Sequence, residues 1–539
     1  MFRAALVLVA LTACHGGDDA PAQPDAGVTP DAPIAPTCEG KTPAECGAAW
    51  EQAAADKFDA VKGDRDDLSA FLTAMPKGGD LHQHLNGAVY AEKVLDWART
   101  DGNCINSTTY STVASNQCGA ATMPTPTMGA FYDAILRAWS MKDFVPTPTN
   151  TGHDHFFSTF GKYGLVAGLH RDDAIADVLE RAASENQLYI ETMFNLGRNV
   201  GNLAASTWSG AVTPAMFETF YAQLKASPQF ASSVASDVAV IADAAASYRA
   251  ILGCDDQGAT DACDVKVRFI AQISRTGAND TIFGQLVGAF EMAAQNGNIV
   301  GANLSSPEDD TTSLNNYDLH MQMIAFLRTK YTDTSASPLQ ITLHAGEVVP
   351  KYLPAGSNHN TFHVKSAVEI AKANRIGHGV DIATETDSAA LMAKMATDGV
   401  AVEICLSSND QILEVKGAAH PMKAYMAAGV PVVLSTDDQG VSRSSLANEY
   451  VVAALDQGLG YRQLKTITRD SIEHSFLPGA SLWTSVAQAK PITACTATDT
   501  MGVGDAPNAA CQAFLDTSER ATLQWELERR FRVFEAAQP

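Results

Sequence analysis

Between about residues 79 and 437 the chain alternates short apolar runs with amphipathic segments, and this alternation constrains its fold more than any other feature. Segments such as Val364–Ala373 and Ser388–Asp398 repeat apolar residues at three- and four-residue steps, as helices do. Continuously apolar strands that alternate with helices form parallel sheets covered on both faces. The pattern therefore predicts an α/β fold, a (β/α)8 TIM barrel, with a doubly wound sheet as the alternative. The eight expected strands are Gly79–Leu85, Leu188–Phe194, Val265–Ser274, Ile299–Leu304, Gln340–His344, Arg375–His378, Val400–Leu406 and Pro431–Ser435.

The spacing of the strands is irregular in one place. About a hundred residues separate the first expected strand from the second, and residues 98–160 among them are rich in Thr, Ser, Asn and Pro. We expect an insertion there, pinned by a disulfide between Cys104 and Cys118, that overhangs the barrel mouth as lids do. Residues 38–74 are expected to form an N-terminal helical segment. Residues 75–539 would form the barrel domain, with a C-terminal extension over 479–539 that ends in a helix, Ser518–Ala536.

The N-terminus has the pattern of a signal peptide. Arg3 precedes the apolar stretch Ala4–Leu11, which is too short to span a bilayer, and small residues follow. The sequence Leu11-Thr12-Ala13-Cys14 is similar to a bacterial lipobox, so residues 1–13 are a predicted signal peptide and Cys14 a predicted lipid anchor. Ordinary cleavage beside an incidental cysteine is the alternative. Residues 14–37, rich in Pro, Asp, Ala and Gly, predict a disordered tether. We therefore expect an exported protein, lipid-anchored in the bacterial cell envelope, that touches the membrane only through Cys14.

Charge and cysteines limit the partners and the compartment. The formal charge of −24 argues against binding to a nucleic-acid backbone. Nine cysteines remain beside Cys14, and Cys405 lies in an apolar run, where a buried thiol is expected. The other eight fall in close pairs, and an oxidising compartment favours disulfides between them, although sequence alone leaves the connectivity open. The expected pairs are Cys38–Cys46, Cys104–Cys118, Cys254–Cys263 and Cys495–Cys511.

Polar residues follow the downstream ends of four expected strands. His82 and His84 are two residues apart on a strand, so their side chains share one face. His344 ends another strand, and Asp437 follows the eighth. The carboxyl ends of all strands meet on one rim of a barrel, so these four side chains can meet. Three imidazoles and one carboxylate make a zinc shell with room for a water molecule.

Three further polar residues lie beside these ligands. Glu347 comes three residues after His344 and is placed for proton transfer rather than ligation. His378 and Asp438 come from neighbouring positions on the rim and can orient or deprotonate water at the metal. Each residue alone could equally be a satisfied polar group at a strand end. Their joint placement at four strand exits favours a hydrolytic metal site.

The same segments resemble the motifs of the adenosine deaminase family, in the family's order. The resemblance implies a (β/α)8 barrel with one Zn²⁺ bound by His82, His84, His344 and Asp437. It also implies that Glu347 protonates the purine N1, that His378 holds the attacking hydroxide, and that Asp438 binds water and the N7 side. The motifs are Met75-Pro76-Lys77-Gly78-Gly79-Asp80-Leu81-His82-Gln83-His84-Leu85-Asn86-Gly87-Ala88, His344-Ala345-Gly346-Glu347, Arg375-Ile376-Gly377-His378-Gly379, Glu403-Ile404-Cys405-Leu406-Ser407-Ser408-Asn409 with His420-Pro421, and Leu434-Ser435-Thr436-Asp437-Asp438.

The resemblance also implies the substrate and where this chain departs from the family. It places His84, Asn86, Gly87, Ser306 and Asp438 around a small-molecule purine nucleoside. Asn86 stands where the family usually carries an aspartate that contacts the ribose 5′-hydroxyl, and an asparagine resembles the branch that acts on N6-substituted AMP. Ser306 stands where a glycine normally offers its N–H to purine N3. The long dimerisation domain of the secreted, growth-factor-related branch is missing, so the oligomeric state stays open.

The expected reaction is hydrolytic deamination of adenosine and 2′-deoxyadenosine to inosine and 2′-deoxyinosine. The alternatives are another 6-aminopurine substrate (N6-substituted AMP, AMP or adenine) or a catalytically silent nucleoside-binding lipoprotein. A binuclear amidohydrolase is disfavoured because Ile299–Leu304 lacks the usual bridging lysine. A cytidine-deaminase fold is excluded because the chain has no H-x-E with P-C-x-x-C. His153 and His155 form another H-x-H pair, which we expect to lie in a loop rather than bind metal, and the neighbouring Phe156, Phe157 and Phe160 are candidates for an apolar lid.

Overall fold

Eight parallel strands form the central sheet of this protein. The structure, a computed structural model, describes residues 40–256, 259–332, 338–495 and 507–538. The strands pair in the order β1-β5-β6-β7-β8-β9-β10-β11, so each predicted strand is present and each pairs with its neighbour in the predicted series. Their bounds are β1 Lys77–His84, β5 Gln187–Asn195, β6 Lys266–Ser274, β7 Ile299–Ser305, β8 Gln340–Ala345, β9 Arg375–His378, β10 Ala401–Ile404 and β11 Val432–Leu434.

The sheet is a nearly closed barrel. β1 and β11 meet through a single parallel bridge between Gln83 and Asp437. Two backbone hydrogen bonds support the closure: Asp437 N–H donates to His82 O at 2.8 Å, and His84 N–H donates to Asp437 O at 3.1 Å. The barrel therefore closes at the carboxyl ends of its first and last strands, where three of the predicted metal ligands lie.

Helices follow the strands and cover the outside of the barrel. On α11 the residues Ile282, Phe283 and Leu286 are buried, as the apolar spacing predicts. The predicted helix Ser388–Asp398 is α14 without change, whereas the predicted helix after β8 stops at Glu369. The covering helices are α7 Arg171–Ser184, α8 Arg198–Thr207, α9 Phe217–Lys225, α10 Phe230–Leu252, α11 Asn279–Ala293, α12 Thr311–Thr332, α13 His363–Glu369, α14 Ser388–Asp398, α15 Leu406–Leu413, α16 Met422–Ala427, α17 Gln439–Ser442, α18 Leu446–Leu455 and α19 Tyr461–Glu473.

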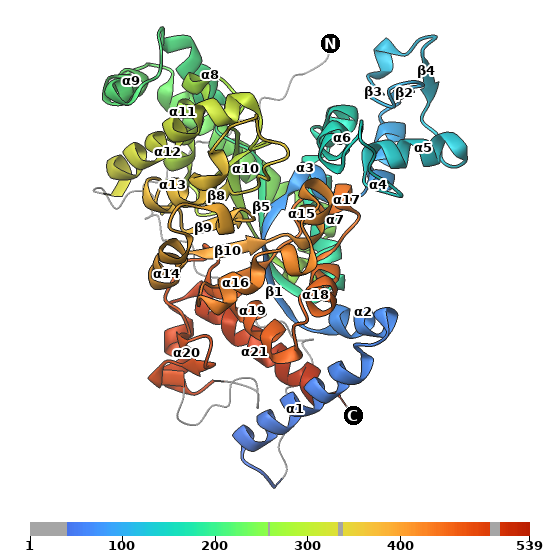
Figure 1. Cartoon of the computed structure of the whole chain (residues 1–539), viewed down its shortest axis with the longest axis vertical. Coiled ribbons are helices and arrows are strands. Elements are labelled where there is room, and N and C mark those ends of the chain that lie inside the picture. Colours follow the sequence, from blue (N-terminus) through green and yellow to red (C-terminus); the bar gives the residue numbers. More distant parts are fainter. Residues whose placement is uncertain (1–39, 257–258, 333–337, 496–506, 539) are drawn as a thin grey trace, which may run out of the picture. The chain divides into compact units, whose positions relative to one another are not determined.

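The predicted insertion after the first strand is present and pinned as expected. The disulfide Cys104–Cys118 joins a small three-stranded sheet to its own connecting loop. The chain then returns through α6, which packs against α15 so closely that a side chain at Gly152 would meet the backbone of Gln411. The elements between β1 and α7 are α3 Leu85–Ala88, α4 Ala91–Thr100, β2 Cys104–Asn106, β3 Thr112–Val113, β4 Thr122–Pro124, α5 Ala130–Trp139 and α6 Gly152–Ala167 (Figure 1).

Helices from both ends of the described chain pack on the barrel's outer wall. α1 Pro43–Val61 and α2 Arg65–Ala74 precede β1, and α1 contacts α21, Glu519–Ala536. The disulfides Cys254–Cys263 and Cys495–Cys511 are confirmed, and Cys405 is a buried thiol as predicted. The predicted signal peptide, Cys14, the tether and Cys38 of the predicted Cys38–Cys46 pair lie outside the described residues.

One described helix, α10, is long and apolar enough to cross a membrane by length and composition. It contacts α7 and α8, and Val234, Ile241 and Ala244 are buried there. The two oxygens of Asp237 accept the backbone N–H groups of Asn199 and Val200 at 3.1 Å each. In this structure the helix therefore serves as part of the wall around the barrel.

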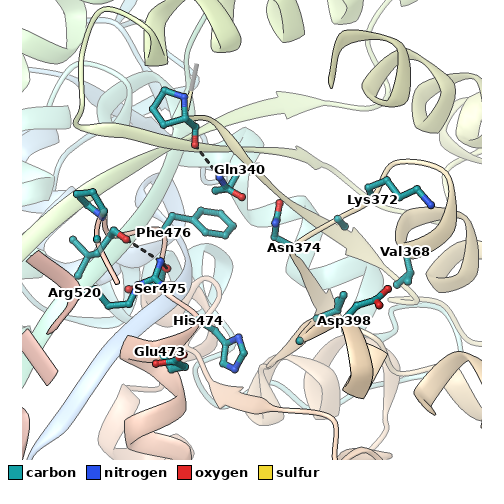
Figure 2. A pocket seen from close by; sticks show the side chains of 17 residues that line it. Gln340, Val368, Lys372, Asn374, Asp398, Glu473, His474, Ser475, Phe476 and Arg520 are labelled. Atoms are coloured by element: carbon teal, nitrogen blue, oxygen red, sulfur yellow. Dashed lines mark hydrogen bonds between the residues drawn. The ribbon is translucent and has the colours of Figure 1, made fainter. Parts of the chain in front are cut away.

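A cavity of about 490 Å³ lies at the amino-terminal ends of β8 and β9 (Figure 2). Gln340, Asn374, His474 and Phe476 are among its lining residues. In a parallel barrel the catalytic loops stand at the opposite, carboxyl-terminal end of the strands. This cavity is therefore separate from the predicted site.

Candidate active site

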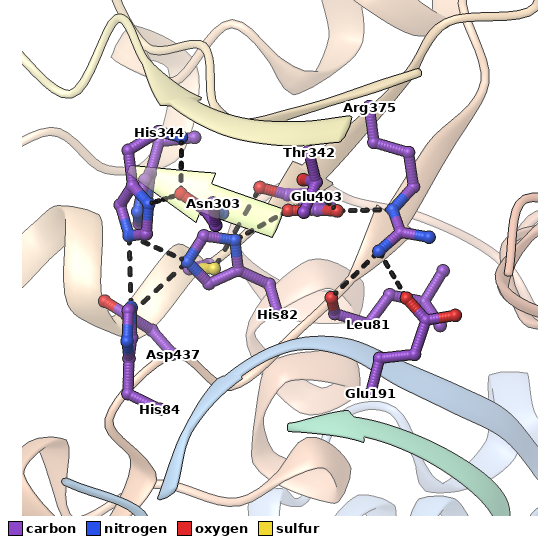
Figure 3. Close-up of polar contacts among 12 residues, drawn as sticks. Leu81, His82, His84, Glu191, Asn303, Thr342, His344, Arg375, Glu403 and Asp437 are labelled. Atoms are coloured by element: carbon purple, nitrogen blue, oxygen red, sulfur yellow. Dashed lines mark hydrogen bonds and ion pairs between the residues drawn. The ribbon is translucent and has the colours of Figure 1, made fainter. Parts of the chain in front are cut away.

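The four predicted metal ligands meet in one buried cluster (Figure 3). Nε2 of His344 lies 3.1 Å from Nε2 of His82 and 3.1 Å from Nε2 of His84. Oδ1 of Asp437 lies 3.6 Å from Nε2 of His82 and 3.3 Å from Nε2 of His84. Strands β1 and β8 and the end of β11 supply these groups, although 355 residues separate the first from the last (437 minus 82). The barrel rim brings them together, as the sequence predicts.

Each of the three imidazoles is held from behind by an acceptor oxygen. Nδ1 of His82 lies 2.6 Å from Glu403 Oε2. Nδ1 of His84 lies 3.2 Å from the amide oxygen of Gln272, and Nδ1 of His344 lies 2.7 Å from that of Asn303. An acceptor at Nδ1 requires the proton there, so each Nε2 presents its lone pair to the centre of the cluster.

This donor set fits one divalent cation. Ligands about 2.0–2.2 Å from a tetrahedral ion lie roughly 3.3 Å from one another, which is close to the separations observed here. Three imidazole lone pairs and a carboxylate at such distances repel unless a positive charge lies between them. Burial disfavours the charged form of His82, but hydrogen bonds and charges from Asp437 and Glu403 outweigh this and raise its pKa to about 10. The shell therefore favours a positive charge at its centre.

His378 stands beside the ligands but is held differently. Its ring is fully buried, and its Nδ1 lies 3.0 Å from the amide nitrogen of Asn409. Its Nε2 has no hydrogen-bond partner among the described residues and lies 3.6 Å from Oε1 of Glu347. Burial, with the positive charge of His82, lowers the pKa of His378 to about 3. A neutral imidazole therefore faces the space between the ligands and Glu347.

Glu347 is a buried acid whose backbone is held by another carboxylate. Burial and the charges of Asp437 and Glu308 raise the pKa of Glu347 well above its usual value, which favours its protonated form. The oxygens of Glu308 accept the N–H groups of Gly346 at 3.0 Å and Glu347 at 2.8 Å. Glu308 in turn contacts His363 Nδ1 at 2.5 Å. Neither Glu308 nor His363 was predicted as a site residue, since their role depends on contacts between distant segments.

The residues predicted to bind the substrate lie around the same end of the barrel as the four predicted metal ligands. Oδ1 of Asp438 is buried without a hydrogen-bond partner among the described residues, and a side chain at Gly87 would collide with it. Ser306 has φ +84°, so it adopts the left-handed conformation that the expected glycine would favour, and its hydroxyl lies 2.8 Å from that of Ser274. Asn86 is half-buried on α3 next to Gly87.

The second H-x-H pair, His153 and His155, lies apart from the metal cluster. It stands on α6 rather than in the predicted loop. Nε2 of His153 lies 3.2 Å from Asp309, and its ring stacks on Tyr352. His155 contacts the backbone of the insertion instead. Its neighbour Phe156 is buried. His153 therefore ties the insertion helix to the loops that follow β7 and β8.

Sequence comparison identifies the family. A family model described as adenosine deaminase matches residues 204–482, just over half of the chain. The chain belongs to the adenosine deaminase family. The matched range contains His344, Glu347, His378 and the Asp437–Asp438 pair, and it begins after the first strand. His82 and His84 lie on β1, outside the matched range. The closure of the barrel between β1 and β11 brings them next to the matched residues.

Curated relatives carry the names of two purine deaminases. An adenine deaminase of Rhizobium leguminosarum bv. trifolii is 31% identical over 195 residues, which cover 36% of this chain and 53% of the relative. An adenosine deaminase of Erwinia tasmaniensis is 30% identical over 215 residues, covering 40% of this chain and 57% of the relative. The chain thus spans about half the length of these curated relatives.

Solved structures overlap with most of the chain at low identity. An Arabidopsis N6-mAMP deaminase is 20% identical, with a TM-score of 0.45, and covers 76% of this chain and 96% of its own. An adenine deaminase of Arthrobacter aurescens is 17% identical, with a TM-score of 0.46, and covers 75% of this chain and 94% of its own. The assignment to the adenosine deaminase family rests on the sequence match rather than on these overlaps.

Proposed function

We propose that this protein is a zinc-dependent hydrolase that converts adenosine and 2′-deoxyadenosine to inosine and 2′-deoxyinosine with release of ammonia. The observation that carries the proposal is the meeting of His82, His84, His344 and Asp437 beside Glu347, a buried glutamic acid whose pKa is raised. A metal site with a neighbouring acid is the machinery that hydrolysis at an electron-poor ring carbon requires.

Zinc is the proposed metal, one ion per chain. Imidazole and carboxylate ligands suit Zn²⁺, and water would bind as an additional ligand beside these four. When bound, the ion supplies Lewis acidity that makes water nucleophilic at neutral pH. The outer partners Glu403, Gln272 and Asn303 hold the three rings in the orientation that such an ion needs.

The proposed roles of the other residues follow from their protonation states. The raised pKa of Glu347 favours its acid form, which donates to N1 of the purine and makes C6 electrophilic. Water then adds across the C6–N1 double bond: its oxygen bonds to C6, and N1 gains a proton. The bond between C6 and the exocyclic nitrogen then breaks as this amine takes the hydroxyl proton. Ammonia leaves, and the 6-oxo product remains. His378 orients the attacking water, and Asp438 binds water or the N7 side of the substrate, where N7 can only accept a hydrogen bond.

Asn86 and Ser306 are the residues that bear on the choice of substrate. The backbone of Ser306 adopts the left-handed conformation of the expected glycine, and its hydroxyl is engaged with Ser274. A free nucleoside is the proposed substrate. Asn86 supports N6-substituted AMP as a second candidate, because a neutral amide does not repel a phosphate group as an aspartate would.

A substrate panel tests the proposal. The zinc-loaded protein is incubated with adenosine, 2′-deoxyadenosine, adenine, AMP and N6-methyl-AMP, and ammonia (methylamine for N6-methyl-AMP) is measured together with the loss of purine absorbance. We expect turnover of the two nucleosides to exceed that of the others. Preference for AMP or N6-methyl-AMP would overturn the nucleoside assignment, and an Asn86→Asp variant would then shift the preference toward adenosine.

We also propose that the protein is exported and anchored by a lipid on Cys14. The motif at residues 11–14 supports this, together with the closely spaced cysteine pairs. Detergent phase partition of the natural protein and of a Cys14→Ala variant tests it. Partition of both proteins into the aqueous phase would contradict the anchor.

A further inference from the structure

We infer that Asn409 and His420 are positioning residues that fix the tautomer of His378, so that its Nε2 carries the proton and donates a hydrogen bond to the attacking water. For its catalytic meaning this inference rests on the proposed deamination. The tautomer itself follows from hydrogen bonds alone. Asn409, His420 and His378 are all buried, so water does not replace these contacts.

The chain of hydrogen bonds starts at a backbone group whose role is fixed. The N–H of Met422 lies 3.2 Å from Nδ1 of His420. A backbone N–H can only donate, so Nδ1 of His420 is an acceptor and bears no proton. Burial lowers the pKa of His420 to about 4, so the ring is neutral near pH 7. Its proton is therefore on Nε2.

That proton sets the orientation of the asparagine. Nε2 of His420 lies 3.0 Å from Oδ1 of Asn409, and a donating N–H requires the amide oxygen at this position. The amide nitrogen of Asn409 then points the other way, 3.0 Å from Nδ1 of His378. If the side-chain amide of Asn409 were flipped, its NH₂ group would face the Nε2–H of His420, and two donors would oppose each other. Backbone hydrogen bonds hold it at both ends, from Asn409 N–H to Cys405 O and from Val415 N–H to Asn409 O.

The last step assigns the proton of His378. An amide NH₂ only donates, so Nδ1 of His378 accepts, and its single proton lies on Nε2. This Nε2–H points toward the space beside Glu347 Oε1, 3.6 Å away, where the other described residues leave it without a partner.

The assigned tautomer limits what His378 can do. A nitrogen that carries a proton has no lone pair for a metal, so His378 is not a ligand although it lies within 4.8 Å of His82, His344 and Asp437. The same nitrogen cannot accept a proton from water. His378 therefore donates to the water oxygen and orients it, and a carboxylate must receive the water's proton.

An Asn409→Asp variant tests the inference directly. A carboxylate at this position accepts, so it favours a proton on Nδ1 of His378, and the Nε2 donor is lost in the neutral ring. Nitrogen-15 NMR of histidine-labelled, zinc-loaded protein reports the tautomer of His378. We expect the Nε2–H form in the wild type and loss of that form in the variant. We also expect kcat to fall about 10²–10⁴-fold, with less change in KM and in zinc content.

Two variants of His420 and one control variant distinguish a positioning role from a general loss of structure. His420→Gln retains an amide donor toward Asn409 Oδ1, so it should keep the tautomer and most of kcat, whereas His420→Phe should lose both. Asn448→Asp is a control on α18, because its side chain contacts Ser407 and Ser444 rather than a histidine. It should change neither readout.

The inference is overturned if wild-type His378 carries its proton on Nδ1, or if Asn409→Asp changes neither the tautomer nor kcat. Failure of the proposed function is a separate result. If the wild type deaminates no 6-aminopurine, the NMR spectra still decide the tautomer.

Discussion

The Nδ1 atom of His82 lies 2.6 Å from a carboxylate oxygen of Glu403, and neither side chain is exposed to solvent. The other oxygen of Glu403 accepts from Arg375 at 2.5 Å and from Thr342 at 2.8 Å (Figure 3). Burial opposes ionisation of Glu403, but Arg375 and His82 lower its pKa to about 2. An ionised carboxylate therefore stands behind the first predicted metal ligand, and Arg375 links it to Glu191.

Replacing Glu403 with glutamine should weaken metal binding. The amide keeps the shape of the side chain but removes the charge that orients His82 and makes its ring more basic. We expect the affinity for zinc to fall about 10–100-fold in a chelator competition assay. Glu449→Gln serves as the control, because Glu449 is also buried but accepts from Ser407 and Ser444. Equal affinities for the wild type and the Glu403 variant would refute the role of Glu403.

Replacing Glu308 with glutamine should lower turnover without removing the metal. Both oxygens of Glu308 accept N–H groups of the turn that carries Glu347, and an amide can accept only one of them. We expect kcat to fall at least about 10-fold, since a small displacement of a catalytic acid costs this much. Zinc content should stay at the wild-type level.

Glu385→Gln is the matched control for this effect. Glu385 is buried too, and it accepts backbone N–H groups at the start of α13 rather than at the Glu347 turn. Comparable losses of kcat in both variants would mean that Glu308 has only a general structural role.

The C-terminal helix should stabilise the fold in a pH-dependent way. Glu528 is buried and bound by Arg469 through two hydrogen bonds, of 2.6 and 2.9 Å. Burial would raise the pKa of Glu528, but Arg469 lowers it from 4.5 to about 2. A carboxyl with a depressed folded-state pKa contributes stability above its unfolded value, so this contribution is present above pH 4.5 and is lost as the pH falls toward 2.

Chemical denaturation of a Glu528→Gln variant measures this contribution. We expect a loss of about 3 kcal/mol at pH 7, and a weaker dependence of stability on pH below 4.5 than in the wild type. Glu526→Gln on the same helix should cost less than about 1 kcal/mol, because the pairs of Glu526 with Arg529 and Arg530 are partly exposed. An equal cost for the two variants would contradict the account.

The insertion helix should contribute to substrate binding through His153. This residue contacts Asp309 and Tyr352 from the neighbouring loops and touches none of the proposed reacting groups. We expect His153→Ala to raise KM about 3–10-fold with little change in kcat, as loss of uniform binding does. His155→Ala on the same helix is the control. If steady-state kinetics show that His153→Ala lowers kcat and leaves KM unchanged, helix α6 does not act as a lid.

The sequence predicts the barrel, and the meeting of four polar side chains at its rim, for a physical reason. Parallel strands buried on both faces leave continuous apolar runs, and the first polar residues after them stand on the functional rim. The predicted boundary of an element is wrong where the strand ends before its apolar run does. The predicted strand Val400–Leu406 is confined to Ala401–Ile404 because Leu406 already begins α15.

The residues behind the ligands could not be predicted as such. Glu403 and His82 are 321 positions apart, and only the closed sheet shows that they touch. Asn409 lies in a motif that the resemblance covers, and Asn303 and Glu308 lie near Ser306, but the roles of all three depend on which atoms face them. A single sequence carries no signal for that orientation.

The central claim is that the rim formed by His82, His84, His344, Asp437 and Glu347 deaminates 6-aminopurine nucleosides. The most direct test measures zinc content and ammonia release from adenosine for the wild type and for Glu347→Gln. We expect one zinc per chain in both proteins, ammonia in step with adenosine loss in the wild type, and a rate about 10²–10⁴-fold lower in the variant. A zinc-loaded wild type that releases no ammonia from any 6-aminopurine nucleoside would contradict the claim.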